Sequence, residues 1–113
     1  MRLALLAFIL LLSACTTIDK QIKDWPKLTI QKHEMTFFDL QGKCWKHMPV
    51  MYKLLGGFAF ACAEVNLTNG TCDIYHLHSP SKTDIEHEIS HCNGGDHDGI
   101  LQTYFDGWKR GTR

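Results

Sequence analysis

The chain has 113 residues, and its twelve Lys and Arg side chains balance twelve Asp and Glu side chains at a formal net charge of zero. This length predicts one small domain. The balanced charge, with no basic stripe and no acidic tail, excludes a protein that binds nucleic acid through an extended basic surface.

The N-terminus predicts export. Residues 3–12 are apolar and follow Met1 and Arg2, and such a stretch is too short to cross a bilayer but fits a signal peptide over residues 1–14. Residues 12–15, Leu-Ser-Ala-Cys, resemble the bacterial lipobox, which implies a lipid anchor at Cys15. The resemblance, with Thr16 rather than Asp in the next position, favours the outer membrane, facing the periplasm. The alternatives are a plain signal peptide or a buried helix with an incidental cysteine.

Residues 15–27 are expected to form the lipid anchor and a polar tether, and residues 28–113 a zinc-binding domain. Ile18, Ile22 and Trp25 have the spacing of one amphipathic helical turn, which Pro26 would end. Further along, residues 29–30 and 35–40 are predicted as strands and residues 41–43 as a turn. The apolar spacing over residues 44–55 indicates a short helix, limited by Pro49.

Residues 58–67 and 72–78 are predicted to form a β-hairpin, because Asn69-Gly70 is a strong signal for a two-residue turn. In that register Leu67 lies opposite Cys72, and Cys62 lies opposite Leu77. On the return strand, His76 and His78 share a face. They would either border a metal cleft or be ordinary half-exposed strand residues, and the second interpretation is favoured.

Four cysteines follow Cys15, and an even number in an exported chain predicts two disulfides, which would stabilise a small domain. Three pairings are open in principle. The hairpin separates Cys62 from Cys72 too far for a bridge between them. A bridge at Cys92 would tie the helix before it to the rest of the fold. The candidates are Cys44, Cys62, Cys72 and Cys92. The alternative is that cysteines bind metal, although no C-x-x-C pair is present.

Residues 87–97 read H-E-x-x-H-x-x-G-x-x-H. On a helix, His87 and His91 lie one turn apart on the same face and can bind one metal ion. Gly94 lets the chain turn so that His97 can supply a third ligand, which leaves a fourth position for water. Glu88 is placed to take a proton from that water as general base. The run therefore predicts one Zn²⁺ per chain. The alternative is a histidine-rich helix with solvated rings.

A helix is predicted over residues 84–93, because Thr83 and Glu86 fit a capping box and Ile85 and Ile89 form an apolar stripe. A second helix is expected after the run, since apolar side chains between Ile100 and Trp108 follow helical spacing. Within it, Tyr104 could polarise a substrate carbonyl, but burial in the core is the favoured interpretation.

The run from His87 to His97 resembles the zinc-binding signature of metzincin endopeptidases. The resemblance implies that His87, His91 and His97 bind zinc, that Glu88 is the general acid and base, and that Gly94 forms the turn. Two features depart from that family: every methionine precedes the run, and only sixteen residues follow His97. The expected fold is therefore α+β, a minimal zincin-like domain with an antiparallel hairpin packed on the metal-binding helix and stapled by disulfides.

These patterns predict a lipid-anchored periplasmic zinc hydrolase, a metallopeptidase acting on a peptide or an envelope protein. One alternative is an envelope lipoprotein that binds zinc without catalysis. Another is an envelope-interaction lipoprotein of the exclusion or lysis type that phages and plasmids encode. If His97 lies far from the other two histidines, Asp96 or Asp98 would replace it as a ligand.

Overall fold

The structure is a computed structural model and describes residues 20–48 and 50–112. The predicted signal peptide, Cys15 and Ile18 lie outside the described residues. Two small sheets and a set of helices make an α+β fold. The elements in chain order are β1 (Lys20–Gln21), β2 (Thr29–Glu34), α2 (Phe37–Cys44), the short 3₁₀ helix η1 (Trp45–His47), α3 (Val50–Leu54), β3 (Ala61–Asn66), β4 (Thr71–His76), α4 (Lys82–Cys92), β5 (Gly95–Asp96) and α5 (Ile100–Gly111).

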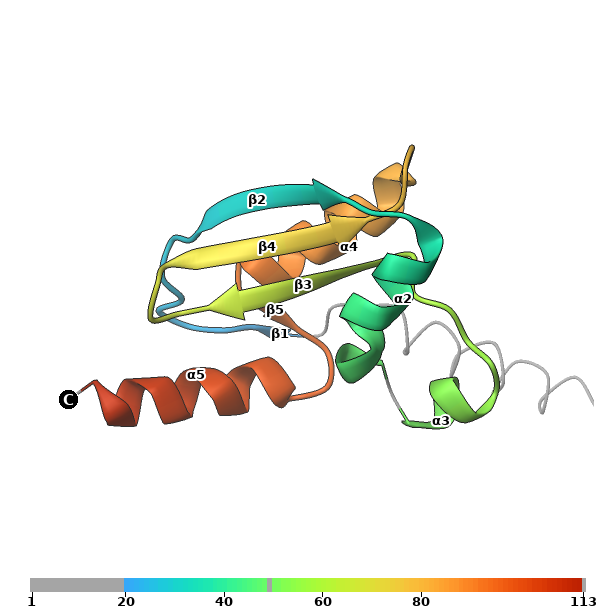
Figure 1. Ribbon diagram of the computed structural model, residues 1–113. Coiled ribbons are helices and arrows are strands. Elements are labelled where there is room, and N and C mark those ends of the chain that lie inside the picture. The colour runs from blue at the N-terminus through green and yellow to red at the C-terminus, as the bar shows by residue number, and fades with distance from the viewer. Residues whose placement is uncertain (1–19, 49, 113) are drawn as a thin grey trace, which may run out of the picture.

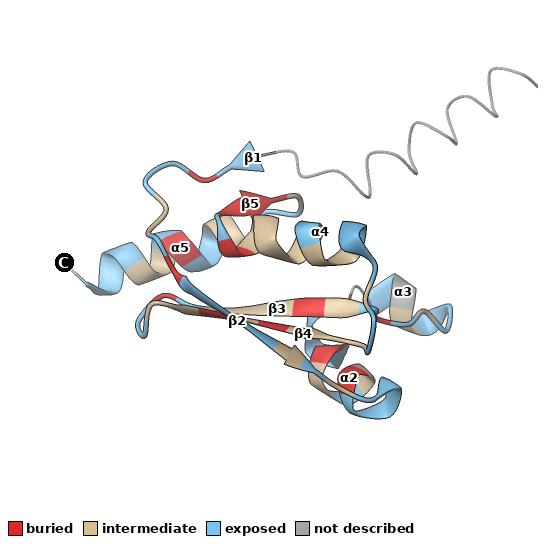
Figure 2. Ribbon diagram, turned by 90° about the horizontal axis from the view of Figure 1, so that it is seen from above, coloured by how far each residue is buried: buried red, intermediate tan, exposed pale blue. Residues whose placement is uncertain are grey.

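The main sheet has the strand order β2-β4-β3, with β2 parallel and β3 antiparallel to the central strand β4 (Figure 1). Seen from above, this sheet lies between α4 on one side and α2 on the other (Figure 2). Alternation along β4 supplies both faces: Cys72 and Ile74 pack with the α4 side, whereas Tyr75 packs with the α2 side. The hairpin packed on a helix is therefore present, within a mixed sheet that has a helix on each face.

Two disulfides join the helices to this sheet, as the cysteine count predicts. Cys44 at the end of α2 pairs with Cys62 of β3, and Cys72 of β4 pairs with Cys92 at the end of α4. All four residues are buried. Disulfides persist in oxidising environments, so the pairing indicates an extracytoplasmic compartment. The described residues contain no helix that is both long and apolar enough to cross a membrane.

The hairpin is present, but its predicted register is wrong by two residues. The ladder closes at Asn66 and Thr71, so that Cys72 lies opposite Val65 rather than Leu67. The connection is a four-residue loop because Leu67 is buried in the core, where its N–H donates to the Tyr104 hydroxyl rather than across the ladder. A shift of two keeps every side chain on its predicted face.

The predicted strand at residues 35–40 is wrong, because residues 37–40 form the first half of α2. Thr36 caps this helix by accepting the N–H of Asp39. The expected turn at residues 41–43 is also helical, and helical spacing buries Leu40 and Cys44 together. Gly42 faces open space, where a glycine weakens a helix without breaking it.

The predicted helix over residues 44–55 is divided in two, η1 and α3. Met48 ends η1 in an extended conformation, with φ −83° and ψ 137°. This follows from the sequence, because the residue before a proline is disfavoured in the helical region. The strand expected from residue 58 begins only at Ala61, after an irregular segment that carries Phe58 and Phe60.

The helical turn expected around Ile22 and Trp25 is wrong. Lys20 and Gln21 instead form β1, which pairs with β5. Ile22 is buried, and Trp25 packs on the same core. Residues 20–27, expected to be part of a tether, thus contact the segment that leads to His97.

Candidate metal centre

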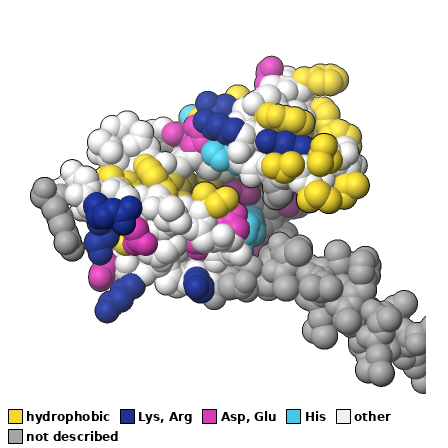
Figure 3. Space-filling model, turned by 90° about the horizontal axis from the view of Figure 1, so that it is seen from below, with side chains coloured by type: hydrophobic (Ala, Val, Ile, Leu, Met, Phe, Trp, Pro, Cys, Tyr) yellow, Lys and Arg dark blue, Asp and Glu magenta, His cyan; other side chains and the backbone are white. Residues whose placement is uncertain are grey.

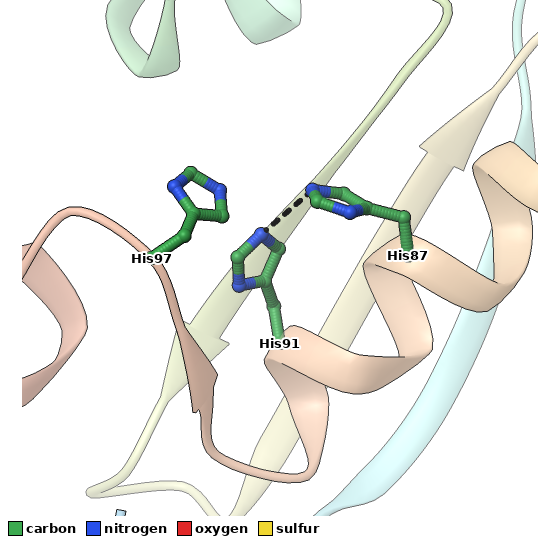
Figure 4. Close-up of side chains that lie close together, drawn as sticks. All are labelled: His87, His91 and His97. Carbon is green, nitrogen blue, oxygen red and sulfur yellow. Dashed lines mark hydrogen bonds between the residues drawn. The ribbon is translucent and has the colours of Figure 1, made fainter. Parts of the chain in front are cut away.

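Helix α4 presents the first two histidines. It begins two residues earlier than predicted, because Ser81 rather than Thr83 is its cap: the Ser81 hydroxyl accepts the N–H of Asp84 at 3.1 Å. His87 and His91 lie one turn apart, and their Nε2 atoms are 3.1 Å from each other. Both ring nitrogens therefore point at the same small volume beside the helix (Figure 4).

The ring of His91 is held by the backbone beyond the helix. Its Nδ1 lies 2.7 Å from the carbonyl oxygen of Gly95, so Nδ1–H donates and Nε2 keeps its lone pair. Metal-binding histidines commonly use such a bond to fix the tautomer and the ring orientation. The remote nitrogen is therefore prepared to accept a metal ion.

Gly94 makes the turn that returns the chain to the histidines, as predicted. Its φ is +90°, and a Cβ there would lie 2.6 Å from Cγ of Trp25. Trp25 also donates its Nε1–H to the carbonyl of Cys92 at 2.8 Å, and the N–H of Ile22 donates to the carbonyl of Gly94. The turn thus needs glycine both for its conformation and for the indole ring beside it.

His97 reaches the same volume from the segment after β5. The three histidines each offer a ligand nitrogen, and these nitrogens all lie within 4.8 Å of one another. The ring centroid of His97 is 4.9 Å from that of His91 and 5.4 Å from that of His87. The structure therefore brings together the three residues that the spacing predicted, as a cluster that could bind a metal ion.

Asp96, the substitute ligand considered from the sequence, has a structural role. Its buried carboxylate accepts the backbone N–H groups of Gly99 and Gln102 and so fixes the start of α5. Burial opposes its charge, but these donors and that of Asp98 outweigh burial and lower the pKa of Asp96. Asp98, the other substitute considered, has its Oδ2 3.9 Å from Nδ1 of His97.

The histidines open into a cleft of about 790 Å³, between α4 and α5 on one side and the end of α2 with the following segment on the other. Strand β3, at the edge of the sheet, lines this cleft. The opposite wall includes Met48, Phe58 and Phe60. In Figure 3 histidine and acidic side chains lie in the recess between the two parts of the surface.

Burial in the cleft favours the neutral forms of His87, His91 and Glu88. Burial, followed by the neighbouring histidines, lowers the pKa of His87, and burial likewise lowers that of His91 against the opposing effect of the Gly95 carbonyl. Glu88 also lines the cleft, where burial and then the Asp84 carboxylate raise its pKa to about 7. Neutral imidazole is the form that binds metal ions.

Of the other residues that the sequence singled out, Tyr104 lines the cleft, whereas His76 and His78 do not. Tyr104 is 40% exposed, so its expected burial in the core is wrong; it lines the cleft, and its hydroxyl accepts the N–H of Leu67 at 3.2 Å. His78 contacts Glu34 and His76 contacts the carbonyl of Leu77, and neither lines the cleft, in agreement with the favoured interpretation. The supporting role of Trp25 was missed, since nothing local in the sequence joins it to residue 94.

Comparison of the chain with protein-family models, with curated proteins and with solved structures finds no match.

Proposed function

We propose that this chain is a zinc-dependent hydrolase of the cell envelope that cleaves peptide bonds. The observation that carries the proposal is the convergence of three histidine nitrogens within 4.8 Å of one another, beside a cleft that Glu88 also lines. A structural zinc site is closed by four protein ligands, whereas three ligands and an open cleft are typical of a catalytic site.

Each residue has a defined role in this proposal. His87, His91 and His97 would hold the metal ion, and the Gly95 carbonyl would keep His91 in the binding tautomer. A bound zinc ion supplies Lewis acidity and a water of lowered pKa. Glu88, adjacent to His87 in the chain, would accept a proton from the attacking water and return it to the leaving amine.

Peptides are the proposed substrates for two reasons. The run from His87 to His97 has metzincin spacing, although no methionine follows it. In addition, β3 is an edge strand that lines the cleft, and an extended peptide can add to such an edge through main-chain hydrogen bonds. The substrate would therefore lie beside the histidines in extended form.

The location of the enzyme is proposed from the sequence and the disulfides. Two disulfides support an extracytoplasmic compartment, and the lipobox-like residues 12–15 support a lipid anchor at Cys15 in the outer membrane. Radioactive palmitate added to growing cells should label the unaltered chain, and Cys15→Ser should not be labelled. Equal labelling of the two proteins would contradict the anchor while leaving the metal site untouched.

A second candidate keeps the metal ion and omits catalysis. Asp98 lines the cleft and has an oxygen 3.9 Å from Nδ1 of His97, so its carboxylate could supply a fourth ligand and close the site. The protein would then store, sense or structurally use zinc.

Two variants distinguish these functions. Purified protein should contain about one zinc ion per chain, and His87→Ala should lose it under both proposals. Glu88→Gln should retain zinc but abolish cleavage of a fluorogenic peptide library under the hydrolase proposal alone. Glu86→Gln, an exposed glutamate on the same helix, is the matched control and should change neither measurement. Full cleavage by Glu88→Gln would exclude Glu88 as the base.

A further inference from the structure

A continuous surface of apolar side chains covers the end of the molecule that carries α2 and α3. Figure 3 shows hydrophobic side chains gathered there, with lysines among them. Nine of the twelve large apolar side chains that the described chain exposes belong to residues 37–60. We call this surface the apolar belt: Phe37, Phe38, Trp45, Val50, Met51, Leu54, Leu55, Phe58 and Phe60.

Contacts join α2 to the segment before β3 within the apolar belt. Phe37 of α2 contacts both Phe38 and Phe58 through ring edges, at centroid distances of 5.6 and 5.4 Å. The Gln41 side chain makes two hydrogen bonds to the backbone of Ala59, which fixes α2 against the segment before β3. Phe37 and Phe58 are therefore held beside each other.

Helix α3 and the residue that follows it, Leu55, carry a strongly exposed part of the apolar belt. Leu54 and Leu55 expose 74% and 80% of their surface, and Val50 and Met51 expose about as much. Scattered apolar residues on a surface need no explanation, but a contiguous patch marks a contact with a partner or a membrane.

The charged side chains in the stretch of chain that carries the apolar belt are mostly positive. Residues 37–60 contain Lys43, Lys46 and Lys53, against one acidic residue, Asp39. Lys53 lies over the Trp45 ring, with Nζ 4.9 Å from its centroid. Lys43 and Lys46 share Glu64 of β3, at 3.8 and 3.1 Å, so the positive charge exceeds the negative one even when this glutamate is included.

We propose that the apolar belt docks on the surface of a bilayer that contains anionic phospholipid. Aromatic and aliphatic side chains with flanking lysines suit the boundary between headgroups and acyl chains. Lysine is depleted at protein–protein interfaces, where arginine is the enriched cation, and residues 37–60 contain lysines and no arginine. Protruding side chains also suit a lipid surface, which deforms around them.

Docking would orient the candidate metal centre. Phe58 and Phe60 belong to the apolar belt and also line the cleft that contains His87. The opening of the cleft would therefore face substrates at the membrane surface. The docking itself needs no metal ion, so it can be tested independently of the proposed hydrolase activity.

Quenching of tryptophan fluorescence by brominated phospholipids tests this contact. The full chain is reconstituted in phosphatidylcholine vesicles with and without phosphatidylglycerol. Trp45 should be quenched, more strongly with phosphatidylglycerol, and Trp45→Phe should remove most of the quenching. Trp25 and Trp108 pack on the core and should contribute little. Replacing Leu54 and Leu55 by Ser should reduce the docked population by about ten-fold, since two apolar side chains no longer enter the interface.

Matched variants make the result decisive. Ile100→Ser, at a residue 71% exposed on α5, should leave the quenching unchanged, as should His87→Ala. Near-UV circular dichroism checks that each variant is folded. Equal quenching in the Leu54→Ser/Leu55→Ser variant, or no quenching of Trp45 in the vesicle-bound chain, would overturn the proposal. Self-association that this variant abolishes, without quenching in the reference protein, would instead make the apolar belt a contact between copies of the chain.

Discussion

On one face of the main sheet, α4 is tied to β4 by Cys72–Cys92, and on the other, α2 is tied to β3 by Cys44–Cys62. The loops that these bonds close are nearly equal, with sequence separations of 20 and 18 residues. The α4 face continues into the turn at Gly94, which the Trp25 indole and the pairing of β1 with β5 hold in place, and it carries the three histidines. The α2 face continues into exposed apolar side chains. A disulfide thus supports the candidate metal centre, which requires fixed geometry, and a second disulfide supports the apolar belt, which does not.

Removing each disulfide gives the largest expected difference between the faces. The Cys72→Ala/Cys92→Ala and Cys44→Ala/Cys62→Ala variants should each lose about 3 kcal/mol of unfolding free energy, because the closed loops are similar. Only the first should also weaken zinc binding, since Cys92 ends the helix that carries His87 and His91. Denaturant unfolding and zinc titration measure the two effects. Equal losses of zinc affinity would show that the faces are not independent.

The turn at Gly94 provides the second comparison. Gly94→Ala should lose roughly 2 kcal/mol or more, because the positive φ disfavours alanine and the new Cβ would clash with Trp25. Gly99→Ala is the matched control, since its φ is +82° but nothing lies within 4 Å of the added atom. It should lose about 1 kcal/mol. Thermal unfolding measures both, and equal losses would remove the role of the indole.

Two tryptophans test the support of the turn more finely. Trp25→Phe should lose about 1 kcal/mol and some zinc affinity, because the carbonyl of Cys92 loses its indole donor. Trp108→Phe removes a buried Nε1 that has no hydrogen-bond partner among the described residues, so its loss should be smaller. A larger loss in Trp108→Phe would reverse this assignment.

The helix caps give the smallest expected effects. Ser81→Ala should destabilise the protein by about 1 kcal/mol, because its hydroxyl accepts an N–H of α4 at 3.1 Å. Thr36→Ala on α2 should cost about half as much, since the corresponding distance is 3.4 Å. Thr83→Ala should have little effect, which would separate the observed cap from the one predicted by sequence.

The sequence predicted the local part of the candidate metal centre well. The position of His87 relative to His91 follows from helix geometry alone, and Gly94 is the residue that a tight return requires. The number of disulfides and the exclusion of a Cys62–Cys72 bridge were also predicted correctly. All of these depend on spacing within a few residues or on the count of one residue type.

The remaining features depend on contacts that spacing does not encode. The hairpin register follows from the burial of Leu67 against Tyr104, thirty-seven residues further along the chain. Residues 35–40 have an apolar pattern that suits a strand until Leu40 and Cys44 are known to share a buried face. The strand at Lys20 forms only because β5 offers it a partner. Tertiary packing therefore overrode the local signals at each of these positions.

The pairing of Lys20 with Asp96 also has a consequence for biogenesis. The N-terminal part of an exported chain crosses the membrane first, so β1 cannot pair until β5 has followed it. The segment that carries His97 can be held in place only after β1 and β5 have paired. Removal of residues 20–22 should therefore weaken metal binding even though α4 and the three histidines are retained, and an exported chain should bind a metal ion only after residue 97 has crossed the membrane.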